Sequence, residues 1–150
     1  MHRLKASFII LITSLLIFAC ASANQKQKMP AFKFGGATLS KDINKSGDLG
    51  IPIEPASEFS TEDDKVISLI RFENLTGKHN LRWEWYDPSG NLYYSTDNFP
   101  FKASRNKYLP LATAWHELSI KGDPAANNPG QWEVKVFLDN ELTGISMLVF

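Results

Sequence analysis

Apolar and polar residues alternate through much of the chain after residue 65, with the period of two that is typical of β-strands with one buried face. The pattern is clear in 80–95, where Leu81, Trp83 and Trp85 alternate with polar or amphipathic neighbours. The segment 87–90 then supplies turn chemistry, because its proline fixes φ and its glycine can take a positive φ. We therefore predict a hairpin of two strands over 80–95.

Two other segments in the middle of the chain predict strands. The segment 66–73 is apolar on both faces at its start, which is typical of a central strand packed on one side and partly covered on the other. The segment 113–121 alternates again, and its two predicted faces consist of His116, Leu118 and Ile120 on one side and Trp115, Glu117 and Ser119 on the other.

The C-terminal segment predicts a second hairpin. The residues predicted to share one face of the strand at 132–138 are Trp132, Val134, Val136 and Leu138. Asp139 and Asn140 suit a two-residue turn, since both residue types tolerate left-handed φ values. The segment 143–150 should close the sheet, and we expect its inward side chains to be Ile145, Met147 and Val149.

The N-terminal half has a weaker pattern. The segment 31–39 predicts a first strand, with a bulge or bend at the glycine pair 35–36. Prolines, glycines and scattered charges follow, so we predict a long loop at about 40–63. The segment 98–111 also contains prolines and charges, and is predicted to be loop with at most a short edge strand.

The number and spacing of these segments predict the fold class. Short strands separated by turn signals, without a long helical period, indicate an all-β fold, an antiparallel β-sandwich. Aromatic residues make up 12% of the chain and are concentrated after residue 80, and cores rich in aromatic and β-branched residues favour sheets. About 130 residues are enough for one domain, which we place at 31–150.

The first 19 residues have the pattern of an export signal. Arg3 and Lys5 precede an apolar run over 8–19. That run is shorter than the roughly 20 residues of a membrane-spanning helix and has the length of a signal-peptide core. We therefore expect 1–19 to be removed, and the polar segment that follows to be a flexible tether.

Two cleavage sites compete after this signal. The sequence Ile-Phe-Ala-Cys at 17–20 resembles the lipobox of bacterial lipoproteins, and Cys20 is the only cysteine. The resemblance implies that Cys20 is acylated and anchors a tether over 20–30 to the cell envelope, with Ala21 favouring the outer membrane. The alternative is cleavage after Ala23, in the small-residue site 21–23, which would release a soluble periplasmic or secreted protein.

A second resemblance concerns the domain itself. The tryptophan pair at 83 and 85 and the sequence PGQWEVKVFLDNELTG at 129–144 resemble immunoglobulin-like and fibronectin type III modules. The resemblance covers most of the chain from about Val66 onward and implies a sandwich fold. It implies little about activity, because sandwiches have many unrelated functions.

The sequence contains little that points to catalysis, a metal or a cofactor. Once the signal is removed, the histidines are His79 and His116, and neither has the spacing of a metal site. We predict no enzyme activity, no cofactor and no metal; a deep pocket joining His116 to a carboxylate such as Glu117 or Asp123 would revive an enzymatic interpretation. The formal net charge is +0 with no basic run, which argues against nucleic-acid binding.

Two non-catalytic hypotheses remain. The first is an envelope lipoprotein, held to the membrane by Cys20, whose sandwich binds or assembles with another envelope protein by an edge strand or a face. The second is a carbohydrate-binding module, in which outward-facing rings stack on a glycan. The candidate contact residues are Tyr86, Tyr93, Tyr94 and Trp115. The competing interpretation is that these rings complete the core.

Overall fold

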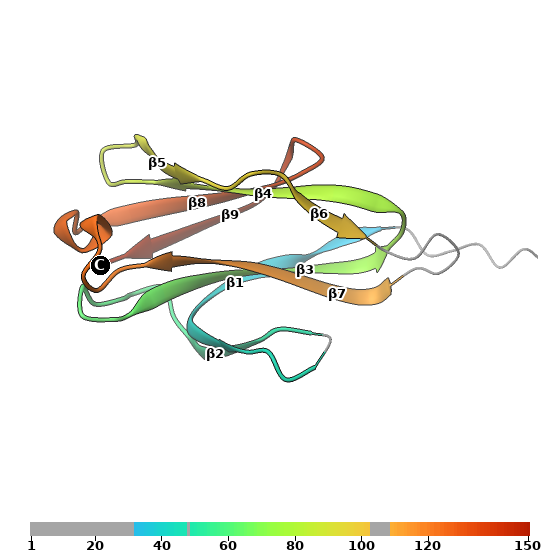
Figure 1. Ribbon diagram of the computed structural model, residues 1–150, viewed down its shortest axis with the longest axis horizontal. Helices are drawn as coiled ribbons and strands as arrows, with labels where there is room; N and C mark the ends of the chain where they lie inside the picture. The colour runs from blue at the N-terminus through green and yellow to red at the C-terminus, as the bar shows by residue number, and fades with distance from the viewer. Residues whose placement is uncertain (1–31, 48, 103–108) are drawn as a thin grey trace, which may run out of the picture.

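Two antiparallel sheets pack face to face in the computed structural model, which describes residues 32–47, 49–102 and 109–150 (Figure 1). The predicted class, an all-β antiparallel sandwich, is confirmed. The only helical element among the described residues is η1 (Pro124–Asn127), a single 3₁₀ turn. The signal, Cys20 and the tether lie outside the described residues, and no helix in the described part of the chain is long and apolar enough to cross a membrane.

Sheet A has four strands in the order β2-β1-β3-β7. The strands are β1 (Lys33–Asn44), β2 (Ile51–Pro55), β3 (Lys65–Leu75) and β7 (Leu109–Ser119). Each neighbouring pair is antiparallel. Among the described residues β7 pairs only with β3, so β7 forms one edge of this sheet and β2 forms the other.

Sheet B has the order β5-β4-β8-β9, and β6 also pairs with β4. Its strands are β4 (Lys78–Tyr86), β5 (Leu92–Ser95), β6 (Phe99–Lys102), β8 (Gln131–Leu138) and β9 (Glu141–Val149). The strands β5 and β6 share one edge of β4, because β5 pairs with residues 84–86 and β6 with residues 78–81.

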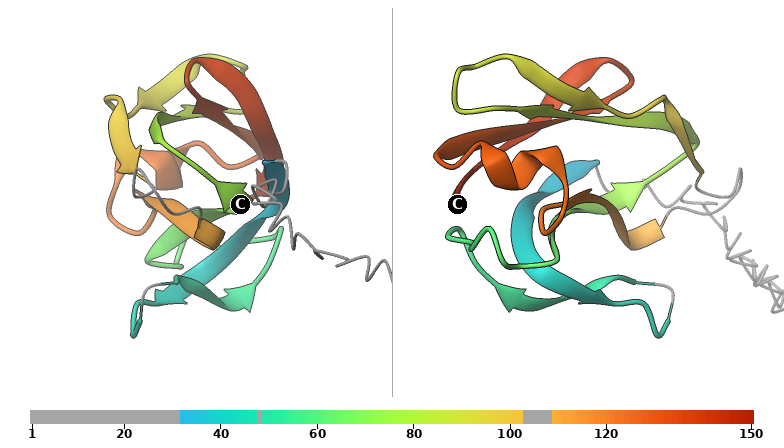
Figure 2. Two further views of the ribbon diagram at one scale, coloured as in Figure 1. Left: turned by 90° about the vertical axis from the view of Figure 1, so that its right-hand side faces the viewer. Right: turned by 60° about the vertical axis from the view of Figure 1, so that its left-hand side comes forward.

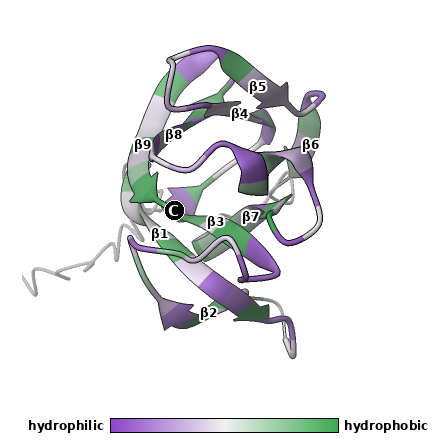
Figure 3. Ribbon diagram, turned by 90° about the vertical axis from the view of Figure 1, so that its left-hand side faces the viewer, coloured by the Kyte–Doolittle hydropathy of each residue, from purple (hydrophilic) through white to green (hydrophobic). Residues whose placement is uncertain are grey.

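The core lies between the two layers, and hydrophobic positions recur along the strands of both (Figure 3). The predicted division of the strands into faces is largely confirmed. The side chains that are buried on β4, at the end of β7 and just after it, and on β8 are Leu81, Trp83, Trp85, Leu118, Ile120, Trp132, Val134, Val136 and Leu138. His116, which shares a face with Leu118 and Ile120, is half-buried. Burying side chains of this size stabilises the fold by about 1.5–3 kcal/mol each.

The strand β3 is buried on both faces, as a central strand should be. Its outward residues Ile67 and Leu69 form a second apolar cluster with Ile43 of β1. The segment before β2 adds to this cover, because the Gly50 backbone N–H donates a buried 2.8 Å hydrogen bond to the Thr113 hydroxyl of β7.

Both predicted hairpin turns are confirmed. In the first, the Gly90 N–H donates to the Asp87 carbonyl at 2.9 Å, and Gly90 has φ 79°. In the second, Asp139 and Asn140 both have positive φ, at 52° and 69°, as a two-residue turn of the primed type requires. The bulge predicted in the first strand is also present, between Phe34 and Gly36.

The second turn is bound to β4 through Asp139. Its carboxylate accepts hydrogen bonds from His79 Nδ1 at 2.7 Å and from the Asn80 N–H at 2.9 Å. Burial opposes the charged form of Asp139, but these hydrogen bonds hold the pKa of its carboxyl below the usual value of 3.8.

The prediction of a long loop at about 40–63 is wrong for two segments, which form strands. The strand β1 continues to Asn44, and β2 pairs with it, with Asn44 opposite Ile51 and Asp42 opposite Ile53. The two prolines of β2 argued against a strand. They are tolerated because β2 is an edge strand, where a missing N–H need not break a ladder hydrogen bond.

The predicted inward face of β9 is also wrong. Ile145, Met147 and Val149 point outward, with 52%, 45% and 47% of their surface exposed. Directly opposed residues of antiparallel strands share a face. Because Leu148 lies opposite the buried Trp132, Leu148 and Gly144 face the core, and the odd-numbered residues from Ile145 onward do not.

The two lateral sides of the sandwich differ. Figure 2 (left) shows β9, in red, beside β1, in blue-green, on one side, and β6 and β7, in yellow and orange, on the other. The β9 side is joined by backbone hydrogen bonds, in which the Phe59 N–H donates to the Val149 carbonyl and the Val149 N–H donates to the Ser57 carbonyl. The β6–β7 side has a cleft.

Candidate functional site

A hollow of about 410 Å³ lies between β6 and β4 of sheet B and the edge strand β7 of sheet A. We call it the β6–β7 cleft. Its principal lining residues are Leu81 and Trp83 of β4, Phe99 and Phe101 of β6, and Ala114 and His116 of β7. Phe99 stands at the rim with 67% of its surface exposed. The lining is therefore mainly apolar and aromatic.

Local sequence explains why the core is not filled here. The inward residue of β7 that precedes His116 in the cleft wall is the small Ala114, which lies opposite Ile70 of β3. On the other wall, the edge of β4 that faces away from β8 has no single long partner. The strands β5 and β6 on this edge are four residues each, and Thr96 lies in the gap between them. A small side chain and an interrupted edge together leave the cleft.

His116 lies at the inner wall, among aromatic rings. Trp85 Nε1 donates a 3.1 Å hydrogen bond to His116 Nδ1, and the Tyr94 ring stacks on the imidazole with centroids 5.5 Å apart. Burial lowers the pKa of His116 below its usual 6.5, against an opposing effect of Glu117. His116 is therefore neutral at pH 7, with its proton on Nε2 because Nδ1 is the acceptor.

A second hollow, of about 240 Å³, adjoins His116 near β5. Its lining includes His116, Glu117 and Asp123, but the hollow is small and open rather than the deep pocket that would revive an enzymatic interpretation. In addition, His116 Nδ1 is already bonded to Trp85, and Glu117 lies 3.8 Å from the Lys65 ammonium. The described residues show no hydrogen bond between His116 and either carboxylate.

Two buried polar atoms near the cleft lack a hydrogen-bond partner among the described residues: Trp83 Nε1 and Ser68 Oγ. Trp83 lines the cleft with only 3% of its surface exposed, and Ser68 lies opposite His116 in the β3–β7 register. A buried donor or acceptor left unpaired costs about 1–3 kcal/mol. Such groups are exceptional in folded proteins and call for an explanation.

The structure does not bring the four predicted aromatic contact residues into one patch. Tyr86 lies on the outer face of sheet B, where its hydroxyl donates to Glu84 at 2.7 Å and Lys135 lies over its ring. Tyr93 is half-buried, with its ring edge-on to Trp132. Tyr86 therefore belongs to a surface network, and Tyr93 lies at the boundary of the core.

The other two predicted residues lie near His116. Tyr94 is exposed and lines the smaller hollow. Trp115 reaches the wall of the β6–β7 cleft, although its ring packs on the outward cluster of sheet A and lies under the Lys45 ammonium. Cys20, the predicted lipidation site, lies outside the described residues.

Sequence reasoning missed the β6 wall of the cleft. Phe99 and Phe101 fall in the segment predicted to be mostly loop. The signal that could have found them is their alternation with Pro100 and Lys102, which a short edge strand tolerates. Ala114 was also missed, because a small residue on an alternating strand does not indicate whether the space beside it is filled.

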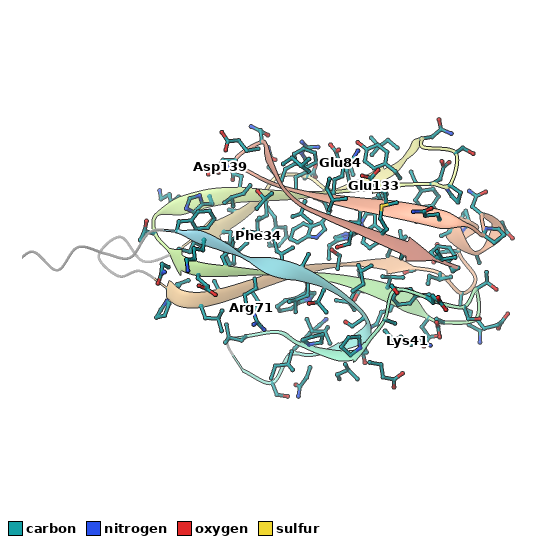
Figure 4. The ribbon with its side chains drawn as sticks, turned by 180° about the vertical axis from the view of Figure 1, so that it is seen from behind. Phe34, Lys41, Arg71, Glu84, Glu133 and Asp139 are labelled. Carbon is teal, nitrogen blue, oxygen red and sulfur yellow. The ribbon has the colours of Figure 1, made fainter. Side chains whose placement is uncertain are left out.

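Charged side chains elsewhere are mostly paired with each other. Glu84 and Glu133 project from the outer face of sheet B (Figure 4), where Arg82 pairs with Glu84 and Lys135 with Glu133. On sheet A, Lys41 pairs with Asp63. In the described part of the chain, no group of three or more histidine, cysteine, aspartate or glutamate residues could hold a metal ion.

Comparison with known proteins finds a likeness of fold. No protein-family model and no curated protein sequence matches the chain. Among solved structures, the chain is similar to an immunoglobulin-like protein from Pseudomonas aeruginosa, with a TM-score of 0.44 and 14% identity, covering 81% of this chain and 98% of that chain. It is also similar to part of the alkylpurine DNA glycosylase AlkC from Pseudomonas fluorescens bound to DNA containing an abasic site analogue, with a TM-score of 0.43 and 12% identity, covering 62% of this chain and 27% of that chain. At these identities the likeness says nothing about a ligand.

Proposed function

We propose that this chain is a non-catalytic envelope lipoprotein whose β-sandwich binds another envelope protein at the β6–β7 cleft. The observation that carries the proposal is the apolar cleft of about 410 Å³ beside an unpaired strand edge. Exposed apolar surface of this kind usually marks an interaction site. Phe99 at the rim is the most exposed large hydrophobic side chain among the described residues, so burying it against a partner would stabilise the complex.

The other sheet edges are poorer candidates. Natural proteins protect edge strands with prolines, charges, short length or cover. The strand β2 has two prolines and Glu54, β5 and β6 are short, and the end of β9 is covered by segment 57–59. By contrast, β7 has eleven residues and no charged side chain before Glu117.

The proposed location rests on the N-terminal sequence. Acylation at Cys20 would hold the domain at the envelope, in the outer membrane by the analogy of Ala21, through the tether 20–30. Mass spectrometry of the mature N-terminus tests this part independently. An acylated Cys20 is the expected result, and a free Asn24 would instead mean cleavage after Ala23 and a soluble protein.

Site-specific photo-cross-linking in intact cells tests the binding function. A photo-reactive residue replaces Phe99 at the cleft rim, and a matched control replaces Thr143 of β9, on the opposite side of the sandwich. We expect a discrete cross-linked product with another envelope protein from position 99 and none from position 143. Equal labelling at both positions, or none at position 99, would contradict the proposal.

The second candidate function is carbohydrate binding, favoured by the exposed Tyr94 ring beside the cleft. Fewer of the predicted aromatic contact residues support this function, because the Tyr86 ring is covered by Lys135 and Tyr93 packs on Trp132. A glycan array and a pull-down on peptidoglycan distinguish the two functions. Binding that Tyr94→Ala abolishes, without a protein cross-link from position 99, would replace the first function with the second.

A further inference from the structure

Resting on the proposed protein-binding function, we infer the chemistry of the partner segment at the β6–β7 cleft. The partner contributes an extended strand that pairs with the free edge of β7 and places large apolar side chains, at alternate positions, into the cleft. A basic residue of the partner lies at the end of the cleft near His116. Four features of the structure lead to this inference.

The first feature is the free backbone edge of β7. Among the described residues β7 makes ladder hydrogen bonds only to β3, so every second N–H and C=O along it points away from the sheet. A row of unpaired backbone groups is a template for another strand. Because β7 has no charged side chain before Glu117, no charge along that stretch keeps an added strand away.

The second feature is the shape of the cleft. In an added strand every second side chain lies on the inner face of the sheet. Beyond β7 those side chains would enter the space that Ala114 leaves open, against Phe99 and Phe101. Large apolar side chains are therefore needed at alternate positions, and polar ones between them would face water or the outer side of sheet A.

The third feature is the excess of acidic groups at one end of the cleft. Asp97 follows the cleft residue Thr96, and Glu117 and Asp123 line the adjoining hollow; all three are exposed. The cation paired with Glu117 is Lys65, which is closer to Asp42, at 3.1 Å, than to Glu117, at 3.8 Å. A basic partner residue at this end complements the charge and orients the added strand.

The fourth feature excludes a second copy of this chain as the occupant. Two copies could pair through β7, but each would then offer Ala112, Ala114 and His116 toward the cleft of the other. Two alanines cannot fill a space of about 410 Å³. A copy would also bring Glu117 rather than a basic residue, so the strand must come from a different protein.

The test uses the processed protein as purified from the cell envelope, in detergent if it is lipidated. The probe is a labelled nine-residue peptide in which leucine and threonine alternate and one end is lysine. Two matched peptides carry N-methyl groups, on the leucine amides in one and on the threonine amides in the other. All leucine N–H groups of a strand lie on one edge and all threonine N–H groups on the other, so each peptide blocks one edge.

We expect the parent peptide to bind, and exactly one of the methylated peptides to bind at least tenfold more weakly, as followed by fluorescence anisotropy. Hydrogen exchange read by mass spectrometry should slow in β7 and not in β2. Filling the cleft with Ala114→Leu should weaken binding at least tenfold, while the matched control Thr143→Leu on β9 leaves it unchanged. Phe99→Asp, at an exposed position that the fold tolerates, should have the same effect if Ala114→Leu proves unstable.

The outcomes separate this inference from the function on which it rests. Equal binding by the parent and both methylated peptides, or no protection of β7, would overturn strand addition. A foreign protein cross-linked from position 99 would then still support protein binding. A cross-link from position 99 to a second copy of this chain would overturn the foreign strand, and the absence of any cross-link would count against the function itself.

Discussion

The two lateral sides of this sandwich differ in how closely the edges of the two sheets meet. On the β9 side, a Cβ atom added at Gly144 would lie 3.1 Å from Phe34 Cζ, so the two layers meet closely. Figure 4 shows Phe34 on β1 between the two layers. On the β6–β7 side, Ala114 faces a hollow and Phe99 is exposed. One side joins the two sheets, and the other leaves an edge and a cleft available.

The comparison shows that the neighbour opposite a small residue, more than the residue's own size or polarity, separates the two sides. Glycine and alanine are both small apolar residues, yet Gly144 permits close contact whereas Ala114 leaves space. The difference lies in what stands opposite, because Phe34 reaches Gly144 while β6 does not reach Ala114 closely enough to fill the gap. A small residue is therefore informative only together with its tertiary neighbours.

The largest expected contrast is between large side chains on the two sides. Leu148→Ala should reduce the free energy of unfolding by about 2–5 kcal/mol, because Leu148 is 1% exposed and its loss leaves a cavity. Phe99→Ala at the cleft rim should cost less than about 1 kcal/mol. Urea unfolding of both variants measures the contrast, and equal losses would mean that the cleft is closed in solution.

Substitutions that add volume should also destabilise the β9 side more than the β6–β7 side. Gly144→Val should destabilise the protein by about 1–3 kcal/mol, because its side chain must displace Phe34. Ala114→Leu should change stability by no more than about 0.5 kcal/mol, since its side chain enters open space. Thermal unfolding of both variants is the measurement; a destabilised Ala114→Leu would indicate that the cleft is narrower than its volume suggests.

A smaller contrast exists on the open side, between Trp83 and Trp85 of β4. Trp85→Phe removes the donor to His116 Nδ1 and leaves that acceptor unpaired, whereas Trp83→Phe removes an N–H that already lacks a partner. Trp85→Phe should therefore cost about 1–2 kcal/mol more than Trp83→Phe. In a His116→Leu background this difference should disappear, and its persistence would assign it to packing.

The smallest expected effect is a pH dependence on the open side. Burial lowers the pKa of His116, so the unfolded chain binds a proton that the folded chain does not. Stability should fall as the pH drops below about 6.5, the ordinary histidine value. His116→Gln should remove this fall, while the loss at lower pH from Asp139, whose folded pKa lies below 3.8, should remain. Urea midpoints measured from pH 8 to pH 3 test both windows.

Much of the strand pattern could be predicted from the sequence. The alternation around Trp83 and Trp132 identified the inward faces of β4 and β8, and the turn at Asp139 followed from its chemistry. These signals are local, because period and turn type depend on neighbouring residues. The face of β9 was predicted incorrectly, since it depends on pairing with Trp132 rather than on the hydrophobicity of Ile145.

The candidate site was predicted only in part. His116 was predicted to share a face of its strand with Leu118 and Ile120, but the cleft beside it was not foreseen. Its walls come from β4, β6 and β7, and whether side chains from three strands fill a space depends on distances that local patterns do not contain. The tyrosines, predicted as one possible contact surface, are separated for the same reason.

By itself, the sequence determined that this protein is a β-sandwich, which segments form most of its strands, and which side chains line the centre of the core, because strand period and turn chemistry are encoded locally. Only the tertiary structure decided which edge closes and which stays open. That choice depends on long-range contacts, in which Gly144 meets Phe34 on one side and Ala114 meets no partner of sufficient size on the other.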